Sequence, residues 1–140
     1  MQPSAALYNR ADVLTSDVPA GGTMSARAVA RMYAALLGEV DGVRLISPER
    51  LHELSAVAVD DVDQVFGNPC KMALGYSIGR PTADAQSTVT VFGWSGAGGS
   101  HASADTAIGT AFALTKNLFT RDFSTVAHVA AIVTTAVAAS

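Results

Sequence analysis

The chain has 140 residues, of which 49% are hydrophobic and 15% are charged, and its formal net charge is −3. This length suits one domain with a hydrophobic core and is too short for two ordinary domains. Lysines and arginines do not cluster into a stripe that would neutralise phosphates, so nucleic acid is excluded as an expected partner. Cys70 is the single cysteine, which excludes an intramolecular disulfide and a cysteine metal cluster.

Residues 1–18 are predicted to be irregular, because Pro3 and Pro19 each disfavour helical backbone in the residue before them. The same segment lacks the basic region and the sustained apolar region of an export signal. This absence favours a cytoplasmic location.

Two helices are expected in the first half of the chain. Ser25 can cap the first helix, in which apolar residues recur at helical spacing as far as Gly38. The segment Ser47-Pro48-Glu49 predicts the start of the second, with serine at the N-cap and proline at the first helical position, and this helix ends before Asp60. Between the two helices, Asp41-Gly42 predicts the turn of a small hairpin.

The second half of the chain is predicted to form a sheet followed by a helix. Residues 62–69 predict a loop, and strand-like runs follow at residues 72–78, 88–92, 97–104 and 106–114. Their short connections favour an antiparallel meander. Residues 122–139 predict a helix that is apolar on most sides and buried against the sheet, and its apolar stretch is shorter than the ~20 residues that a membrane span needs. The predicted fold class is α+β, with an antiparallel sheet of about three strands and flanking helices.

Residues 89–100 contain an apolar run that breaks into glycines, and such backbone can approach a ligand closely. A glycine-rich hairpin without a ligand is the alternative. A phosphate-binding loop is excluded because no lysine follows these glycines. A dinucleotide fingerprint is excluded because the residues after Gly99 are a poor helix start.

Ser95 could be the nucleophile of two known catalytic arrangements. The segment from Gly93 to Ala97 is one residue short of a nucleophile elbow, which must lead into a helix, and Asp122 and His128 follow it in the required order. A triad of Ser95, His101 and Asp105 would share one face of a strand, but a continuous strand would separate the serine from His101 by about 20 Å. We therefore expect that the three histidines, His52, His101 and His128, are ordinary surface or packing residues.

Four stretches, in this order, resemble motifs of one family. Residues 19–36 look like the family's glycine-initiated helix, and residues 41–49 are similar to its "G-x-x-L-L-S-P-E" step. Residues 73–76, Ala-Leu-Gly-Tyr, match its "G-L-G-[FYW]" strand. Residues 92–100, Phe-Gly-Trp-Ser-Gly-Ala-Gly-Gly-Ser, fall where the family has its third active-site motif, K-T-G or H-x-G followed by A-x-G-G. Together they resemble the C-terminal part of the serine β-lactamase-like hydrolases, which include class C β-lactamases, penicillin-binding proteins and related carboxylesterases.

The resemblance implies a substrate-binding role for the third motif. Trp94, Ser95 and Gly96 would replace the K-T-G triplet, and the backbone N–H of Ala97 would be one of two oxyanion-hole donors. Because Trp94 stands in place of the lysine, the cation that would hold a β-lactam carboxylate is missing. An aromatic residue there suits an uncharged ester better, and no cofactor or metal is expected.

The other two family motifs are not found. No serine lies three residues before Lys71 or Lys116, so the S-x-x-K motif of the nucleophile is absent, and no tyrosine begins a Y-x-N or Y-x-S motif. In the family both motifs precede everything recognised here. Residues 1–140 are thus expected to be a single partial domain, the C-terminal segment of a serine hydrolase. The resemblance implies a carboxylesterase that acts by acyl transfer on a small ester or a β-lactam-like substrate.

By itself this segment is expected to be inactive. The alternative is a non-catalytic remnant or interaction module that keeps half of the fold. In either case an unpaired strand edge would favour self-association.

Overall fold

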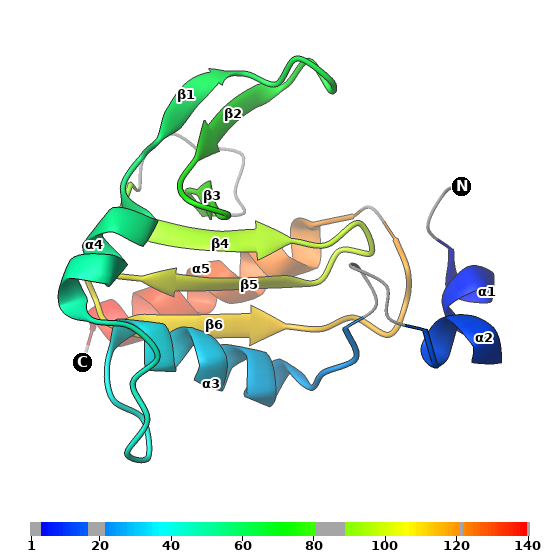
Figure 1. Ribbon diagram of the computed structural model, residues 1–140, viewed down its shortest axis with the longest axis horizontal. Coiled ribbons are helices and arrows are strands. Elements are labelled where there is room, and N and C mark those ends of the chain that lie inside the picture. Colours follow the sequence, from blue (N-terminus) through cyan, green and yellow to red (C-terminus); the bar gives the residue numbers. More distant parts are fainter. Residues whose placement is uncertain (1–3, 17–21, 81–88, 121, 140) are drawn as a thin grey trace.

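The computed structural model describes residues 4–16, 22–80, 89–120 and 122–139. In these residues the chain forms one antiparallel sheet of six strands, in which each strand pairs with the next one along the sequence (Figure 1). The strands are β1 (Val59–Val62), β2 (Pro69–Met72), β3 (Ser77–Ile78), β4 (Val91–Ser95), β5 (His101–Asp105) and β6 (Thr110–Leu114). The predicted α+β class and meander are therefore confirmed, whereas the predicted number of about three strands is wrong.

The additional strands come from an arm that rises from one edge of the sheet (Figure 1). Strands β1 and β2 flank the segment that was predicted to be a loop, and an ion pair of 2.9 Å joins Asp60 to Lys71 across them. The predicted strand at residues 72–78 is divided by a turn in which Ala73 N donates to Tyr76 O, 2.8 Å away, and Gly75 has a φ of 84°. The sequence of β1, Val-Asp-Asp-Val, has little strand propensity, and its side chains are all exposed, so no alternation of burial marks it.

Two single-turn helices, α1 (Ala5–Tyr8) and α2 (Ala11–Leu14), occupy part of the segment that was predicted to be irregular. Ser4 caps α1 by accepting the N–H of Leu7 at 3.2 Å. Neither helix buries a residue fully. Capping and a local ion pair between Arg10 and Asp12 therefore account for structure that apolar periodicity does not indicate.

The helices α3 (Ala26–Leu37) and α4 (Pro48–Ser55) begin at the predicted caps, because Ser25 accepts the N–H of Ala28 and Ser47 accepts that of Arg50. Between them, Val40 and Val43 exchange two backbone hydrogen bonds around a turn in which Asp41 and Gly42 have positive φ. The predicted hairpin is confirmed. Helix α3 covers one face of the sheet, where the core residues are Tyr33, Leu36, Ala73, Ile78, Phe92, Ala102 and Ala104.

Helix α5 (Ser124–Ala138) lies on the opposite face of the sheet from α3 (Figure 1). It buries Val126 and Ala130, but Ile132 is 55% exposed, so it buries one stripe rather than most of its circumference as predicted. No helix in the described part of the chain is long and apolar enough to cross a membrane.

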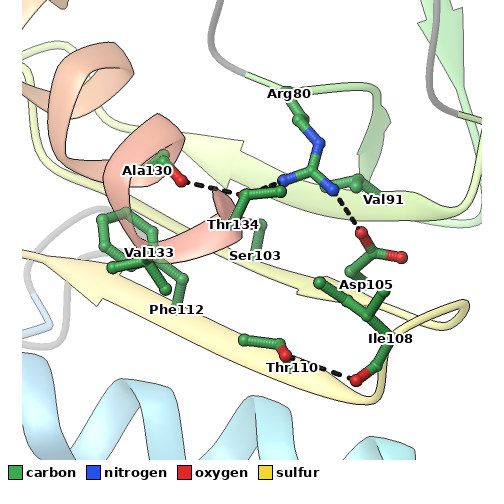
Figure 2. Close-up of a pocket in the computed structure, with 10 residues that line it drawn as sticks. All are labelled: Arg80, Val91, Ser103, Asp105, Ile108, Thr110, Phe112, Ala130, Val133 and Thr134. Atoms are coloured by element: carbon green, nitrogen blue, oxygen red, sulfur yellow. Dashed lines mark hydrogen bonds and ion pairs between the residues drawn. The ribbon is translucent and has the colours of Figure 1, made fainter. Parts of the chain in front are cut away.

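Arg80 fastens α5 to the sheet, through a buried ion pair to β5 and a hydrogen bond to α5 (Figure 2). Arg80, which follows β3, donates to the Asp105 carboxylate of β5 at 2.5 Å and to the Thr134 hydroxyl of α5. The two charged side chains are 22% and 7% exposed. A cavity of about 30 Å³ remains beside them, bounded on the α5 side by Ala130 and Val133. One arginine thus connects three segments that are distant in the sequence.

Candidate functional site

The predicted site residues lie where β4 extends beyond its neighbour β3. The register pairs Ser77 with Gly93 and Ile78 with Phe92. Because β3 begins at Ser77, it has no residue opposite Trp94 or Ser95. A cleft of about 560 Å³ opens at this edge, between the end of β4 and the β1–β2 arm. Trp94, Ser95 and His101 line the cleft on the β4–β5 side.

Trp94 and Ser95 reach the cleft from opposite faces of the strand, because successive strand residues alternate. Trp94 is 53% exposed and shares the face of the buried Phe92, which packs against α3. Ser95 shares the face of Val91, which packs toward α5. The cleft therefore receives an aromatic ring and a hydroxyl group from adjacent residues.

Ser95 Oγ lies 2.8 Å from His101 Nδ1, which overturns the predicted separation of about 20 Å. That separation assumed a continuous strand. Instead, residues 96–100 reverse the chain, with Gly96 N donating to Ser100 O at 2.8 Å and Gly99 N donating to Gly96 O at 3.0 Å. The two side chains are thereby placed directly opposite each other on β4 and β5.

Of the two predicted roles for His101, surface or packing, the structure shows the packing one. Its side chain is 6% exposed, and burial lowers its pKa to about 4. Among the described residues, its Nε2 atom has no hydrogen-bond partner. Asp105 binds Arg80 rather than this imidazole, so Ser95, His101 and Asp105 do not form a triad.

The nucleophile-elbow interpretation of Ser95 is also wrong. Ser95 ends a strand that turns back into the antiparallel β5, whereas the elbow requires a helix at this point. The Asp122 carboxylate accepts the N–H and the hydroxyl of Ser124, both at 2.9 Å, and these bonds lower the pKa of Asp122. His128 is exposed on α5. Neither residue is in the cleft.

Gly96 and Ala97 lie in the turn between β4 and β5. The Gly96 N–H is occupied by the bond to Ser100, whereas the Ala97 N–H has no partner in the part of the chain that the structure describes. Both residues are exposed. Of the two amides, only that of Ala97 is free to donate to a ligand.

The turn is held in shape by the segment that follows β6. Gly99 has a φ of 84°, and a Cβ there would come within 2.9 Å of the carbonyl oxygens of Thr120 and Asp122. The backbone N–H of Lys116 donates to Ser100 Oγ at 3.1 Å, and its ammonium donates to Thr120 Oγ1 and Asp122 O. Sequence reasoning missed this support, because Lys116 is distant in sequence from the turn and no local pattern connects them.

The charged side chains that line the described part of the cleft are bonded to other groups of the protein. Lys71 pairs with Asp60 at 2.9 Å, and Arg80 pairs with Asp105 at 2.5 Å. The Asp63 carboxylate accepts the N–H groups of Val65 and Phe66. The described part of the cleft therefore offers no free cation to an anionic ligand. The described residues also contain no cluster of three or more histidine, cysteine or acidic side chains that could hold a metal ion.

No model of a known protein family matches this chain. It is 37% identical over 117 residues to the protein named Esterase/beta-lactamase LipL of Mycobacterium tuberculosis. The structure resembles that of a penicillin-binding protein homologue from Caulobacter crescentus, with a TM-score of 0.62 and 31% identity over 71% of this chain. The chain is a relative of the serine β-lactamase-like hydrolases. The structure of EstA from Arthrobacter nitroguajacolicus Rue61a is similar as well, with a TM-score of 0.63 and 25% identity over 82% of this chain.

The match to these serine β-lactamase-like hydrolases covers only a part of each. The aligned segment spans 81% of this chain but 26% of LipL. It corresponds to 27% of the Caulobacter protein and 32% of EstA. The resemblance inferred from four short motifs is confirmed, and it concerns about a quarter to a third of the length of each relative.

Proposed function

We propose that this chain supplies the substrate-binding strand of a carboxylesterase-type serine hydrolase that acts by acyl transfer. Its β4–β5 hairpin would bind the acyl group of an ester, with Trp94 as an apolar wall and the Ala97 N–H as an oxyanion donor. The seryl nucleophile and its lysine would come from protein outside this sequence, which contains no S-x-x-K motif.

The free Ala97 N–H, two residues after the cleft-lining Ser95, carries this proposal. A tetrahedral intermediate develops negative charge on its oxygen, and a fixed backbone donor stabilises that charge without reorganising. The close packing of Gly99 against Thr120 and Asp122 supports a fixed turn. The relative LipL is named an esterase/beta-lactamase, which supports an ester as the substrate class.

The charge of the cleft favours a neutral ester over a carboxylate. Both cations in the described lining, Lys71 and Arg80, already have carboxylate partners, and Trp94 occupies the position where the family resemblance places a lysine. A β-lactam carboxylate would therefore be desolvated without gaining a counter-ion.

A pair of matched ligands tests the proposal on the chain as it exists. Ethyl phenylacetate, a neutral ester, should shift the NMR signal of the Trp94 indole N–H, and the phenylacetate anion should bind at least about tenfold more weakly. The isolated chain should hydrolyse neither p-nitrophenyl esters nor a chromogenic cephalosporin, and a fluorophosphonate probe should not label it. Absence of any ester binding would contradict the proposal and favour a non-catalytic interaction module.

A further inference from the structure

The contact between Ser95 and His101 follows from their place in the β4–β5 ladder. Gly96 and Ser100, the next pair toward the turn, are joined by a backbone hydrogen bond. Because bonded and non-bonded pairs alternate in an antiparallel ladder, Ser95 and His101 form a non-bonded pair, in which the side chains lie closest. The hydroxyl and the imidazole are therefore held together by the sheet itself.

The surroundings of His101 indicate whether His101 Nδ1 or Ser95 Oγ is the donor in this contact. If Nε2 carried the ring proton, a buried N–H donor would have no partner among the described residues. If Nδ1 carries it, the proton is donated to Ser95 Oγ, and only an unpartnered acceptor is buried. Buried N–H groups without partners are rarer in proteins than unsatisfied acceptors. The structure therefore favours a ring that is protonated at Nδ1.

We propose that His101 is a positioning residue that donates Nδ1–H to Ser95 Oγ and thereby leaves the Ser95 hydroxyl proton free to bind the carbonyl oxygen of an ester in the cleft. This inference rests on the proposed function, since it names the group that recognises the substrate. Ser95 makes no other side-chain hydrogen bond with a described residue and lines the cleft beside Trp94. Its hydroxyl proton is consequently available to a ligand in the cleft.

The same geometry excludes His101 as a general base for Ser95. An imidazole that is protonated at Nδ1 has no lone pair there to accept the serine proton. Its other nitrogen is buried away from the hydroxyl, and the nearest carboxylate on the same strand face, Asp105, is bound to Arg80. Burial lowers the pKa of His101 to about 4, which keeps the ring neutral at neutral pH. Ser95 is thus a binding hydroxyl and not a nucleophile.

The tautomer of His101 can be measured on the unmodified chain. In a two-bond 1H–15N correlation spectrum of protein labelled at histidine, the His101 ring should show a protonated Nδ1 and an unprotonated Nε2 at about pH 7. The signal is assigned by its loss in His101→Phe. A ring protonated at Nε2, or labelling of Ser95 by a fluorophosphonate, would overturn the proposal.

Two substitutions then distinguish a positioning role of His101 from a role in packing alone. His101→Asn keeps a nitrogen donor near the position of Nδ1, whereas His101→Phe fills the space without one. Ethyl phenylacetate should bind to His101→Phe and Ser95→Ala about three- to tenfold more weakly than to the unmodified chain, and His101→Asn should restore most of the loss. Equal affinity in His101→Phe and the unmodified chain would overturn the proposal. Because the tautomer is measured without ligand, a chain that shows the expected tautomer but binds no ester would contradict only the proposed function.

Discussion

Ser95 Oγ and His101 Nδ1 lie 2.8 Å apart across two neighbouring strands, and the imidazole is almost completely removed from solvent. A buried imidazole resists protonation, whereas the same ring in the unfolded chain takes up a proton below about pH 6.5. Folding therefore changes how strongly His101 binds a proton, and the stability of the fold depends on pH through this residue.

We expect the free energy of unfolding to fall as the pH drops from 6.5 to about 4, the unfolded and folded pKa values of His101. In this window the unfolded chain binds more protons than the folded chain, so acid favours unfolding, by at most about 3 kcal/mol from this one group. Urea titrations at several pH values measure the effect. His101→Phe should lose it, and the exposed His128→Gln should retain it; an unchanged acid dependence in His101→Phe would refute the assignment.

Arg80→Met should destabilise the fold by about 3–5 kcal/mol, because it leaves the Asp105 carboxylate buried without its partner. Thermal or urea unfolding measures the loss. Arg50→Met is a matched control, since Arg50 forms an exposed ion pair with Glu53 and should be removable at little cost. If the two variants were equally stable, the buried bonds of Arg80 to Asp105 and Thr134 would not stabilise the fold.

Gly99→Ala should both destabilise the chain and weaken ester binding. The new Cβ would meet the carbonyl oxygens of Thr120 and Asp122, and the residue has a φ of 84°. Gly109→Ala provides the control, because Gly109 also has a positive φ of 63° but has open space around it. That variant should lose about 1–2 kcal/mol from backbone strain alone and bind ethyl phenylacetate normally. Normal binding by a folded Gly99→Ala chain would show that the turn need not be rigid.

Trp94→Ala should raise the dissociation constant for ethyl phenylacetate about tenfold to a hundredfold, since aromatic burial against a ligand is worth roughly 1–3 kcal/mol. The melting temperature should change little, because the side chain is already 53% exposed. Trp94→Lys should instead improve binding of the phenylacetate anion. A large loss of stability with unchanged ligand affinity would mean that the ring serves packing only.

The β1–β2 arm should promote self-association of the isolated chain. Its tip exposes Val65 and Phe66 at 83% and 77%, and β1 is an edge strand of the sheet. Light scattering should therefore show species larger than a monomer at high concentration. The double variant Val65→Lys and Phe66→Lys should shift the distribution toward monomer. A monodisperse monomer in the unmodified chain would remove the basis of this expectation.

The elements that were predicted correctly are those whose signals are local. Ser25 and Ser47 cap helices through bonds to residues three positions away, and Asp41-Gly42 makes its turn from its own backbone angles. These features need no knowledge of what packs against them.

The features that were missed depend on distant contacts or on backbone angles that composition does not reveal. The glycines of residues 96–100 suit a strand kink and a reversal equally, so the sequence did not distinguish a 20 Å separation from a direct contact between Ser95 and His101. Strand β1 exists because Asp60 and its neighbours pair with β2, although two aspartates oppose strand formation locally. Lys116 reaches the turn only after β6 has returned the chain to it.

The bridge that Arg80 makes between β5 and α5 also determines which parts of the protein can open together. Detaching α5 would remove Thr134 from the guanidinium and loosen its hold on Asp105, which lies on the same strand as His101. The β1–β2 arm shares none of these bonds and meets the rest of the sheet through the two residues of β3. Local opening of the C-terminal helix should therefore disturb the strand that carries His101 before it disturbs the arm across the cleft, so the two walls of the site belong to separate cooperative units.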